Sequence, residues 1–188
     1  MALCWRTFAT FMQAPLPHTI LNQKFWLSAQ RAVYWEDQKA LILSDLHFGK
    51  TGHFRKAGIA VPQAVFKEDL QRLVSLIQFF KPEQIIAVGD LFHSKANLEL
   101  DLFKRWRQDF EQLQFHLVKG NHDILKADWY EGANLTVTEG VMQVGNIHFS
   151  HEDCSEVEGA FTFCGHLHPG VVLNGFGKQK LRLPCFYF

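Results

Sequence analysis

The sequence predicts an α/β protein in which amphipathic helices cover one β-sheet and a second β-sheet faces the first. Between residues 40 and 118, short apolar runs alternate with segments of helical period, as expected for parallel strands joined by crossover helices. From residue 134 onward only short strand-like runs remain. A chain of 188 residues can bury one sizeable core, so we expect a single domain over 18–188 after a loosely held leader, 1–17.

The four strands expected first form a meander that leads into a buried central strand. Each is a short apolar stretch, and a turn-like Glu36-Asp37-Gln38 precedes the last of them. The stretches are 19–21, 25–27, 32–35 and 40–43.

Two amphipathic helices are predicted between the central strands. Pro62 suits the first turn of a helix, and apolar residues recur at helical spacing from there to Phe80. The second helix is predicted over 98–114. Strands at 84–88 and 115–118 complete a β-α-β-α-β unit, whose strands end at one edge, where open α/β sheets bind their ligands.

The second half is predicted to form a further sheet that faces the first. Six short alternating or apolar runs carry this prediction: 135–138, 141–144, 147–150, 160–164, 171–173 and 180–186.

Composition limits the range of functions. Lys plus Arg equals Asp plus Glu at 19 each, so net charge gives no support for broad electrostatic capture of nucleic acid. Arg6, Gln13 and two prolines interrupt the apolar leader before it reaches spanning length. We therefore expect a soluble, cytoplasmic protein with no membrane partner.

The four cysteines, Cys4, Cys154, Cys164 and Cys185, show no CxxC spacing. This pattern predicts reduced, mostly buried thiols. Cys164 precedes Gly165-His166, so it is either a soft metal ligand or a small buried strand residue. The second interpretation is favoured because free cysteine is among the most buried residue types.

Polar motifs with metal-ligand side chains follow the predicted strands. Taken alone, each motif is typical of a turn. Together they bring carboxylate, amide and imidazole groups to one rim, and these are the ligands of paired divalent cations that hold a phosphate ester. In chain order the motifs are Asp45-x-His47, Gly89-Asp90, Gly120-Asn121-His122-Asp123 and Gly165-His166-x-His168.

One single histidine lies between the third and fourth motifs, and two residues compete for its place. Both His148 and His151 follow the strand start at 144–147. The other candidate ligands stand at strand ends, so His151 is favoured, and His148 is read as a strand-face residue.

With His151, these motifs resemble the signature of calcineurin-like metallophosphoesterases over roughly residues 40–170. Within that superfamily, further segments resemble the PdeM-type, ligase-associated phosphoesterases of bacterial DNA repair: 43–50, 54–59, 89–94, 165–169 and 182–186. The resemblance implies a four-layer α/β sandwich of two mixed sheets flanked by helices, with a dinuclear metal site at the strand ends.

The resemblance also implies which residues bind metal. Its seven ligands fall into two sets that share Asp90 as a bridge: Asp45, His47 and His168 for one cation, and Asn121, His151 and His166 for the other. A shared carboxylate can hold two cations about 3.5–4 Å apart, and a water between them can become the nucleophile. Mixed oxygen and imidazole ligands accept manganese, iron, zinc or cobalt, and the resemblance favours manganese.

Three further residues are expected to act in catalysis. His122, next to Asn121, is placed to donate a proton to the leaving oxygen or to stabilise charge on the phosphoryl group. Asp123 or His93 would orient it.

Three cations are candidates for substrate binding. Lys50 and Arg55 follow the first motif, and Arg182 lies near the end of the chain. Each is read either as a grip on flanking phosphates or as a charge on a solvated surface.

The predicted function is therefore hydrolysis of phosphodiester bonds. The resemblance implies a DNA-repair endonuclease that acts on single-stranded DNA or RNA and partners a DNA ligase and a helicase. Two alternatives stay open: hydrolysis of a small nucleotide diester, and a non-catalytic binding scaffold of the same fold.

Overall fold

Seven strands form the large sheet of the computed structural model, which describes residues 13–50, 64–93 and 98–188. The strands lie in chain order. Their bounds are β1 Leu16–Ile20, β2 Gln23–Ser28, β3 Ala32–Trp35, β4 Ala40–Leu43, β5 Gln84–Val88, β6 Gln114–Val118 and β7 Thr136–Thr138. The predicted meander is confirmed, although β1 begins inside the segment expected to be a leader.

The mode of strand pairing changes once within this sheet, from antiparallel to parallel. From β1 to β4 each neighbouring pair is antiparallel, and from β4 to β7 each pair is parallel. The parallel strands β4, β5 and β6 therefore have their carboxyl ends at one edge. This is the edge on which the first three polar motifs were expected to meet.

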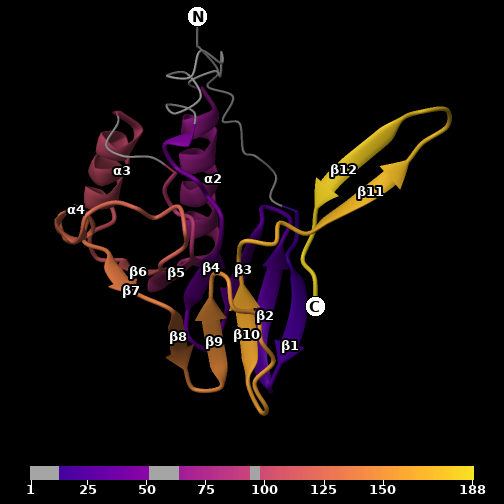
Figure 1. The fold of residues 1–188 in the computed structure, drawn as a ribbon, viewed down its shortest axis with the longest axis horizontal. Helices are drawn as coiled ribbons and strands as arrows, with labels where there is room; N and C mark the ends of the chain where they lie inside the picture. The colour runs from indigo at the N-terminus through magenta and orange to yellow at the C-terminus, as the bar shows by residue number, and fades with distance from the viewer. Residues whose placement is uncertain (1–12, 51–63, 94–97) are drawn as a thin grey trace, which may run out of the picture.

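Among the described residues, three helices cover one face of the large sheet (Figure 1): α2 Ala64–Phe80, α3 Leu98–Gln108 and α4 Ala127–Glu131. The predicted start of the first helix at Pro62 lies outside the described residues. The second helix ends at Gln108 rather than at 114, because the Arg107 guanidinium turns the chain by donating to the carbonyls of Phe110 and Leu113. The short α4 had no counterpart in the sequence prediction.

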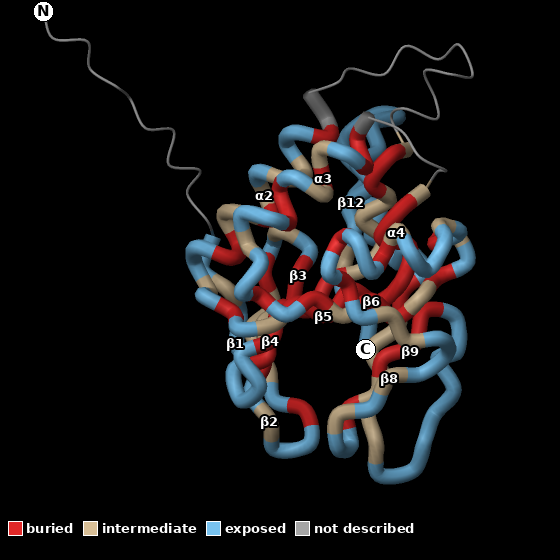
Figure 2. Tube along the Cα trace, turned by 90° about the vertical axis from the view of Figure 1, so that its left-hand side faces the viewer, coloured by how far each residue is buried: buried red, intermediate tan, exposed pale blue. Residues whose placement is uncertain are grey.

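A smaller sheet packs against the other face of the large one (Figure 1). It contains β8 Val141–Val144, β9 Ile147–Ser150 and β10 Phe161–Cys164 in the order β10-β9-β8. In β4, Leu41 packs with the helices while Ile42 packs with Phe149 of the small sheet, because successive side chains of a strand point to opposite faces. The strands β4, β5 and β6 are buried from both sides (Figure 2).

The sequence predicted that the second half would form one further sheet. In the structure its strands are divided among three sheets. β7 joins the edge of the large sheet through parallel pairing with β6. The last two strands, β11 Gly170–Asn174 and β12 Lys180–Pro184, form a separate hairpin that projects from the body (Figure 1). The predicted α/β sandwich of two mixed sheets is confirmed, because the large sheet and the small sheet each contain parallel and antiparallel pairs. Within the described ranges no helix covers the outer face of the small sheet.

Candidate metal centre

The candidate ligands stand on loops that leave five strands at one end of the two sheets. The loops after β4 and β5 run side by side, because Asp45 N–H donates to Gly89 O at 3.1 Å and His47 N–H donates to Asp90 O at 2.9 Å. β9 and β10 are parallel, with Ser150 opposite Cys164, so the loops that carry His151 and His166 also begin side by side. Parallel pairing thus gathers residues that are far apart in sequence.

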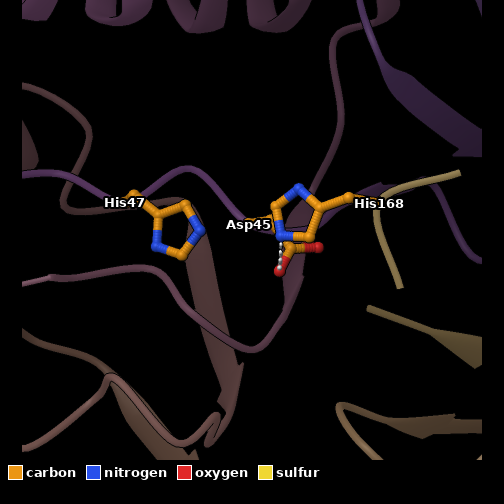
Figure 3. A group of neighbouring side chains, drawn as sticks. All are labelled: Asp45, His47 and His168. Atoms are coloured by element: carbon orange, nitrogen blue, oxygen red, sulfur yellow. Dashed lines mark ion pairs between the residues drawn. The ribbon is translucent and has the colours of Figure 1, made fainter. Parts of the chain in front are cut away.

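One group of side chains, cluster 1, consists of Asp45, His47 and His168 (Figure 3). One ligand atom from each lies within 4.8 Å of the others. His168 Nε2 is 3.4 Å from Asp45 Oδ1, and the rings of His47 and His168 are nearly parallel with centroids 5.7 Å apart. One carboxylate and two imidazoles suit a borderline divalent cation.

A second group, cluster 2, consists of Asp90, His151 and His166, again with ligand atoms within 4.8 Å of one another. His151 Nε2 lies 3.3 Å from Asp90 Oδ1 and 3.2 Å from the amide oxygen Oδ1 of Asn121. Asn121 therefore adds a fourth donor atom beside cluster 2. The donor set of cluster 2 matches that expected for the second cation.

Asp90 lies between the clusters and is buried, with 2% of its surface exposed. Its Oδ1 faces His151 in cluster 2, while its Oδ2 is 4.0 Å from His47 Nδ1 in cluster 1. The His122 backbone N–H fixes the carboxylate by donating to Oδ1 at 2.9 Å. A carboxylate with one oxygen toward each cluster is the arrangement that a bridging ligand requires.

Imidazole orientation in cluster 2 is set by the backbone. His151 Nδ1 is 3.2 Å from the carbonyl of Val88, and a carbonyl only accepts, so Nδ1 carries the proton and Nε2 keeps its lone pair toward Asp90 and Asn121. Gly89 makes room for this ring, since a Cβ there would overlap His151. The Nε2 lone pair of His151 therefore faces the other donor atoms of cluster 2.

The ligand loops adopt a backbone conformation that L-residues rarely take. Five members of the two clusters have a positive φ: Asp45, His47, Asp90, His166 and His168. Left-handed non-glycine residues cost roughly 1–2 kcal/mol each, and such strain gathers at functional sites. Stability alone would not favour this conformation, so it supports a ligand-binding role for these loops.

His47 is neutral at physiological pH. Burial, and after it the nearby Lys50 ammonium, lowers the pKa of His47 to about 4, against the opposing pull of Asp90 and Asp45. A neutral imidazole binds a cation without first losing a proton.

Sequence reasoning missed the role of Ser44. Its hydroxyl lies against Asp45 Oδ2 and 2.9 Å from the Val88 carbonyl, so it orients the carboxylate of cluster 1. The His166 N–H donates to the other oxygen, Oδ1, at 3.2 Å. Serine is too common after strands for this role to be recognised without the fold.

The three residues expected to act in catalysis fall into two kinds. His122 and His93 stand beside the clusters: His122 Nε2 is 4.0 Å from Asp90 Oδ2, and the His93 ring lies 4.5 Å from the His122 ring and 5.3 Å from that of His47. His122 remains 44% exposed. The His122 ring is therefore open to a substrate, and the His93 ring lies against both His122 and His47.

Asp123 is placed differently from the expectation that it orients His122. It is fully buried, and its two oxygens accept the N–H groups of Phe92 and Gly120, each at 2.9 Å. Burial raises the pKa of Asp123 to about 6, although these hydrogen bonds lower it. Its carboxylate ties the loops after β5 and β6 together, because both acceptors are used by backbone donors.

Of the two candidate substrate-binding cations that lie among the described residues, Lys50 stands next to cluster 1, and its charge acts on His47. Arg55 lies outside the described residues. Arg182 is exposed on β12, opposite Val172, on the projecting hairpin. This position agrees with the second interpretation of Arg182, a charge on a solvated surface. Arg182 belongs to neither cluster 1 nor cluster 2.

The cysteine prediction is wrong for one pair. Cys154 and Cys164 are joined in a disulfide, with Cα atoms 5.8 Å apart, whereas reduced thiols were expected. Cys154 is exposed rather than buried. Neither sulfur belongs to cluster 1 or cluster 2, so Cys164 is not a soft metal ligand among the described residues.

Within the residues that the structure describes, no helix has both the length and the apolar character to cross a membrane.

Comparisons with known proteins agree with this geometry. Residues 39–181 match the family model of the calcineurin-like phosphoesterases. A transmembrane protein with a metallophosphoesterase domain from Danio rerio is 28% identical over 113 residues, which are 58% of this chain and only 22% of that protein. The crystal structure of the Pseudomonas putida nuclease MPE matches with a TM-score of 0.78 and 29% identity, covering 92% of this chain and 80% of that one.

The family match covers most of the chain, and it includes every residue of both clusters. The chain belongs to the calcineurin-like phosphoesterase family, whose members are metal-dependent hydrolases of phosphoester bonds.

Proposed function

We propose that this protein hydrolyses phosphodiester bonds of nucleic acid with two divalent cations, preferably manganese, that share Asp90. The carrying observation is the position of that carboxylate, with Oδ2 toward His47 of cluster 1 and Oδ1 toward His151 of cluster 2. A single cation would need only one cluster, so a second cluster beside the same carboxylate supports two cations.

Two bound cations would neutralise charge on the phosphate and generate a hydroxide-like nucleophile at neutral pH. The chain's own residues would do the rest. Asp90 and the imidazoles hold the reacting centre rigidly, since His151 and Asp45 are fixed by the Val88 carbonyl and the Ser44 hydroxyl. His122, next to Asp90 and partly exposed, would give its Nε2 proton to the leaving oxygen. His93 would orient it by ring contact.

The openness of the site supports a polymeric substrate. The side chains of His122 and His168 are 44% and 56% exposed, so a phosphate within a chain can reach the clusters without having to enter a closed pocket. The similarity to a nuclease of Pseudomonas putida supports nucleic acid as the substrate. A role in DNA repair beside a ligase and a helicase belongs to the same proposal.

The balanced charge of the chain favours a second candidate, a small nucleotide diester. A protein with 19 cations and 19 anions has no overall field that attracts a polyanion, and nucleic-acid binding depends on phosphate neutralisation. The two candidates differ in salt dependence, because a polymer that contacts several cations loses affinity steeply as salt rises.

The test uses metal-free protein reconstituted with Mn²⁺. It would be assayed on bis-p-nitrophenyl phosphate, p-nitrophenyl phosphate and single-stranded DNA, beside His122→Ala and Asp90→Asn. His148→Ala is the matched control, because His148 lies three residues from His151 on β9 but outside both clusters.

We expect cleavage of the diester and of DNA, loss of both activities in the two site variants, and full activity in the control. Cleavage of the diester without DNA would move the proposal to a small substrate. If manganese gives no turnover, the assay would be repeated with iron, zinc and cobalt. No turnover with any of these four metals, in protein that binds two ions, would indicate a scaffold.

A further inference from the structure

The Cys154–Cys164 disulfide flanks two ligands of cluster 2. Cys154 follows His151 by three residues, and Cys164 precedes His166 by two. The rings of these histidines are 5.2 Å apart at their centroids. The covalent link therefore joins the two loops that carry both imidazoles of one cluster.

The link closes a small loop around His151. Cys164 is already opposite Ser150 in the β9–β10 ladder, so the segment from Ser150 to Cys154 is held to Cys164 at both ends. The Ser150 hydroxyl accepts the Asp153 N–H at 3.1 Å and closes the same turn. With so few residues between the two attachments, His151 has little freedom to move away from Asp90.

On the other side of the link, the strand that carries Cys164 leads into the close contact between Gly165 and His151. A Cβ on Gly165 would meet His151 Nδ1 at 2.7 Å and the Val88 carbonyl at 2.6 Å. His166 follows at once, with a positive φ. A displacement of Cys164 would therefore change the positions of both histidines.

We propose that this cysteine pair is a reversible redox site that sets the metal affinity of cluster 2. The oxidised form holds His151 and His166 in the binding arrangement, and the reduced form binds the cation of cluster 2 more weakly. The proposal rests on the two-cation function above. It assigns to the link a regulation of cluster 2, because His151 lies inside the closed loop and His166 follows Cys164 by two residues.

The chemistry needs an oxidant, and a peroxide or a small disulfide would serve. With hydrogen peroxide, the two thiols lose two protons and two electrons in total, the S–S bond forms, and the O–O bond breaks to give two waters. With a small disulfide, two exchange steps transfer the bond and release two small thiols. Cys154 is exposed, so either reagent, or a reducing dithiol, can reach the pair.

The first measurement asks whether the link forms. The full chain would be treated with hydrogen peroxide or with a reducing phosphine, its remaining thiols blocked, and its peptides mapped by mass spectrometry. We expect a Cys154–Cys164 cross-link in the oxidised sample only, with Cys185 blocked as a free thiol in both.

The second measurement is calorimetric titration of Mn²⁺ into metal-free protein in each redox state, after the reagents are removed. Loss of a group that orients a metal ligand typically lowers affinity about 10- to 100-fold. We expect two binding events in both states, with one weakened at least about 10-fold by reduction. Cys154→Ser and Cys164→Ser should each match the reduced protein and ignore the reductant, while Cys185→Ser, the matched control, should respond like the wild type.

The outcomes separate this proposal from the one on which it rests. Two binding events of equal strength in both redox states, or failure of the pair to cross-link, would overturn the redox site and leave the two-cation function intact. A single binding event in both states would contradict the two-cation function itself.

Discussion

The two clusters combine one carboxylate with two imidazoles but differ in burial. Cluster 2 has two buried members and an exposed His166, whereas cluster 1 has two half-buried members and an exposed His168. In cluster 2, Asp90 and His151 are both 2% exposed, and the Val88 carbonyl holds the imidazole. In cluster 1, His168 is 56% exposed and stands two residues before the projecting hairpin. His122 and His93 lie next to His47 of cluster 1.

This difference in burial suggests different roles for the two clusters. The two buried, hydrogen-bonded members of cluster 2, Asp90 and His151, hold their geometry through the fold, so they should anchor the centre. Cluster 1 has no fully buried member and lies next to His122, so it should face the phosphate. Variants at the two clusters should therefore differ more in stability than in activity.

The largest effect is expected from Asp90→Asn, because each carboxylate oxygen of Asp90 faces an imidazole of a different cluster. The amide keeps an oxygen for the His122 N–H but loses the charge that two cations share. We expect diester hydrolysis to fall at least about 100-fold and bound manganese to fall from two ions per chain to at most one. Steady-state kinetics and elemental analysis measure the two quantities. Retention of both ions would show that the clusters are independent.

Gly89→Ala tests the close contact that holds His151. Its φ of +75° alone costs a side chain about 1–2 kcal/mol, and overlap with the His151 ring adds about 1–3 kcal/mol more. Gly140→Ala is the matched control, since Gly140 has a φ of +78° and nothing within 4 Å of an added Cβ. Urea unfolding should show the smaller loss in the control, and only Gly89→Ala should lose metal affinity. Equal losses of stability and of metal affinity in the two variants would show that the contact between Gly89 and His151 does not position the ring.

His151→Ala and His168→Ala compare the clusters directly. In metal-free protein, His151→Ala should lower the free energy of unfolding by roughly 2–3 kcal/mol, because it leaves a buried cavity and removes the hydrogen bond to the Val88 carbonyl. The exposed His168→Ala should change it by less than about 0.5 kcal/mol. Both should reduce manganese binding by one ion per chain. If the two variants were equally stable, the distinction between anchor and substrate side would fail.

The smallest effect is expected from Ser44→Ala, which removes the hydroxyl that orients Asp45. Affinity for one of the two cations should fall about 10-fold, as for other groups that position a ligand. Ser75→Ala is the control, because the Ser75 hydroxyl donates only to the Gln71 carbonyl within α2. Calorimetric titration with Mn²⁺ distinguishes the two variants, and an unchanged Ser44→Ala would assign the orientation of Asp45 to the His166 N–H alone.

The parallel half of the fold could be predicted from sequence because its signals are local. The buried runs of β4, β5 and β6 and the amphipathic pattern of α2 follow directly from side-chain period. The polar motifs follow these strands, so their meeting at one edge is a consequence of parallel pairing. His151 was preferred over His148 for the same reason, because it stands at the end of a strand, as the other candidate ligands do.

The rest depends on contacts that no local pattern encodes. The early end of α3 results from Arg107, whose guanidinium reaches carbonyls three and six residues later. The pairing of β7 with β6 and the separate hairpin β11–β12 depend on which edge each strand meets. Asp123 has the spacing of a catalytic partner, and only the fold shows that two backbone donors occupy its oxygens.

Anomalous scattering from crystals grown with Mn²⁺ tests the shared carboxylate most directly. The account predicts two peaks about 3.5–4 Å apart, one bordered by Asp45, His47 and His168 and the other by Asn121, His151 and His166, with one Asp90 oxygen at each. A single peak, or two peaks of which only one contacts Asp90, would contradict it.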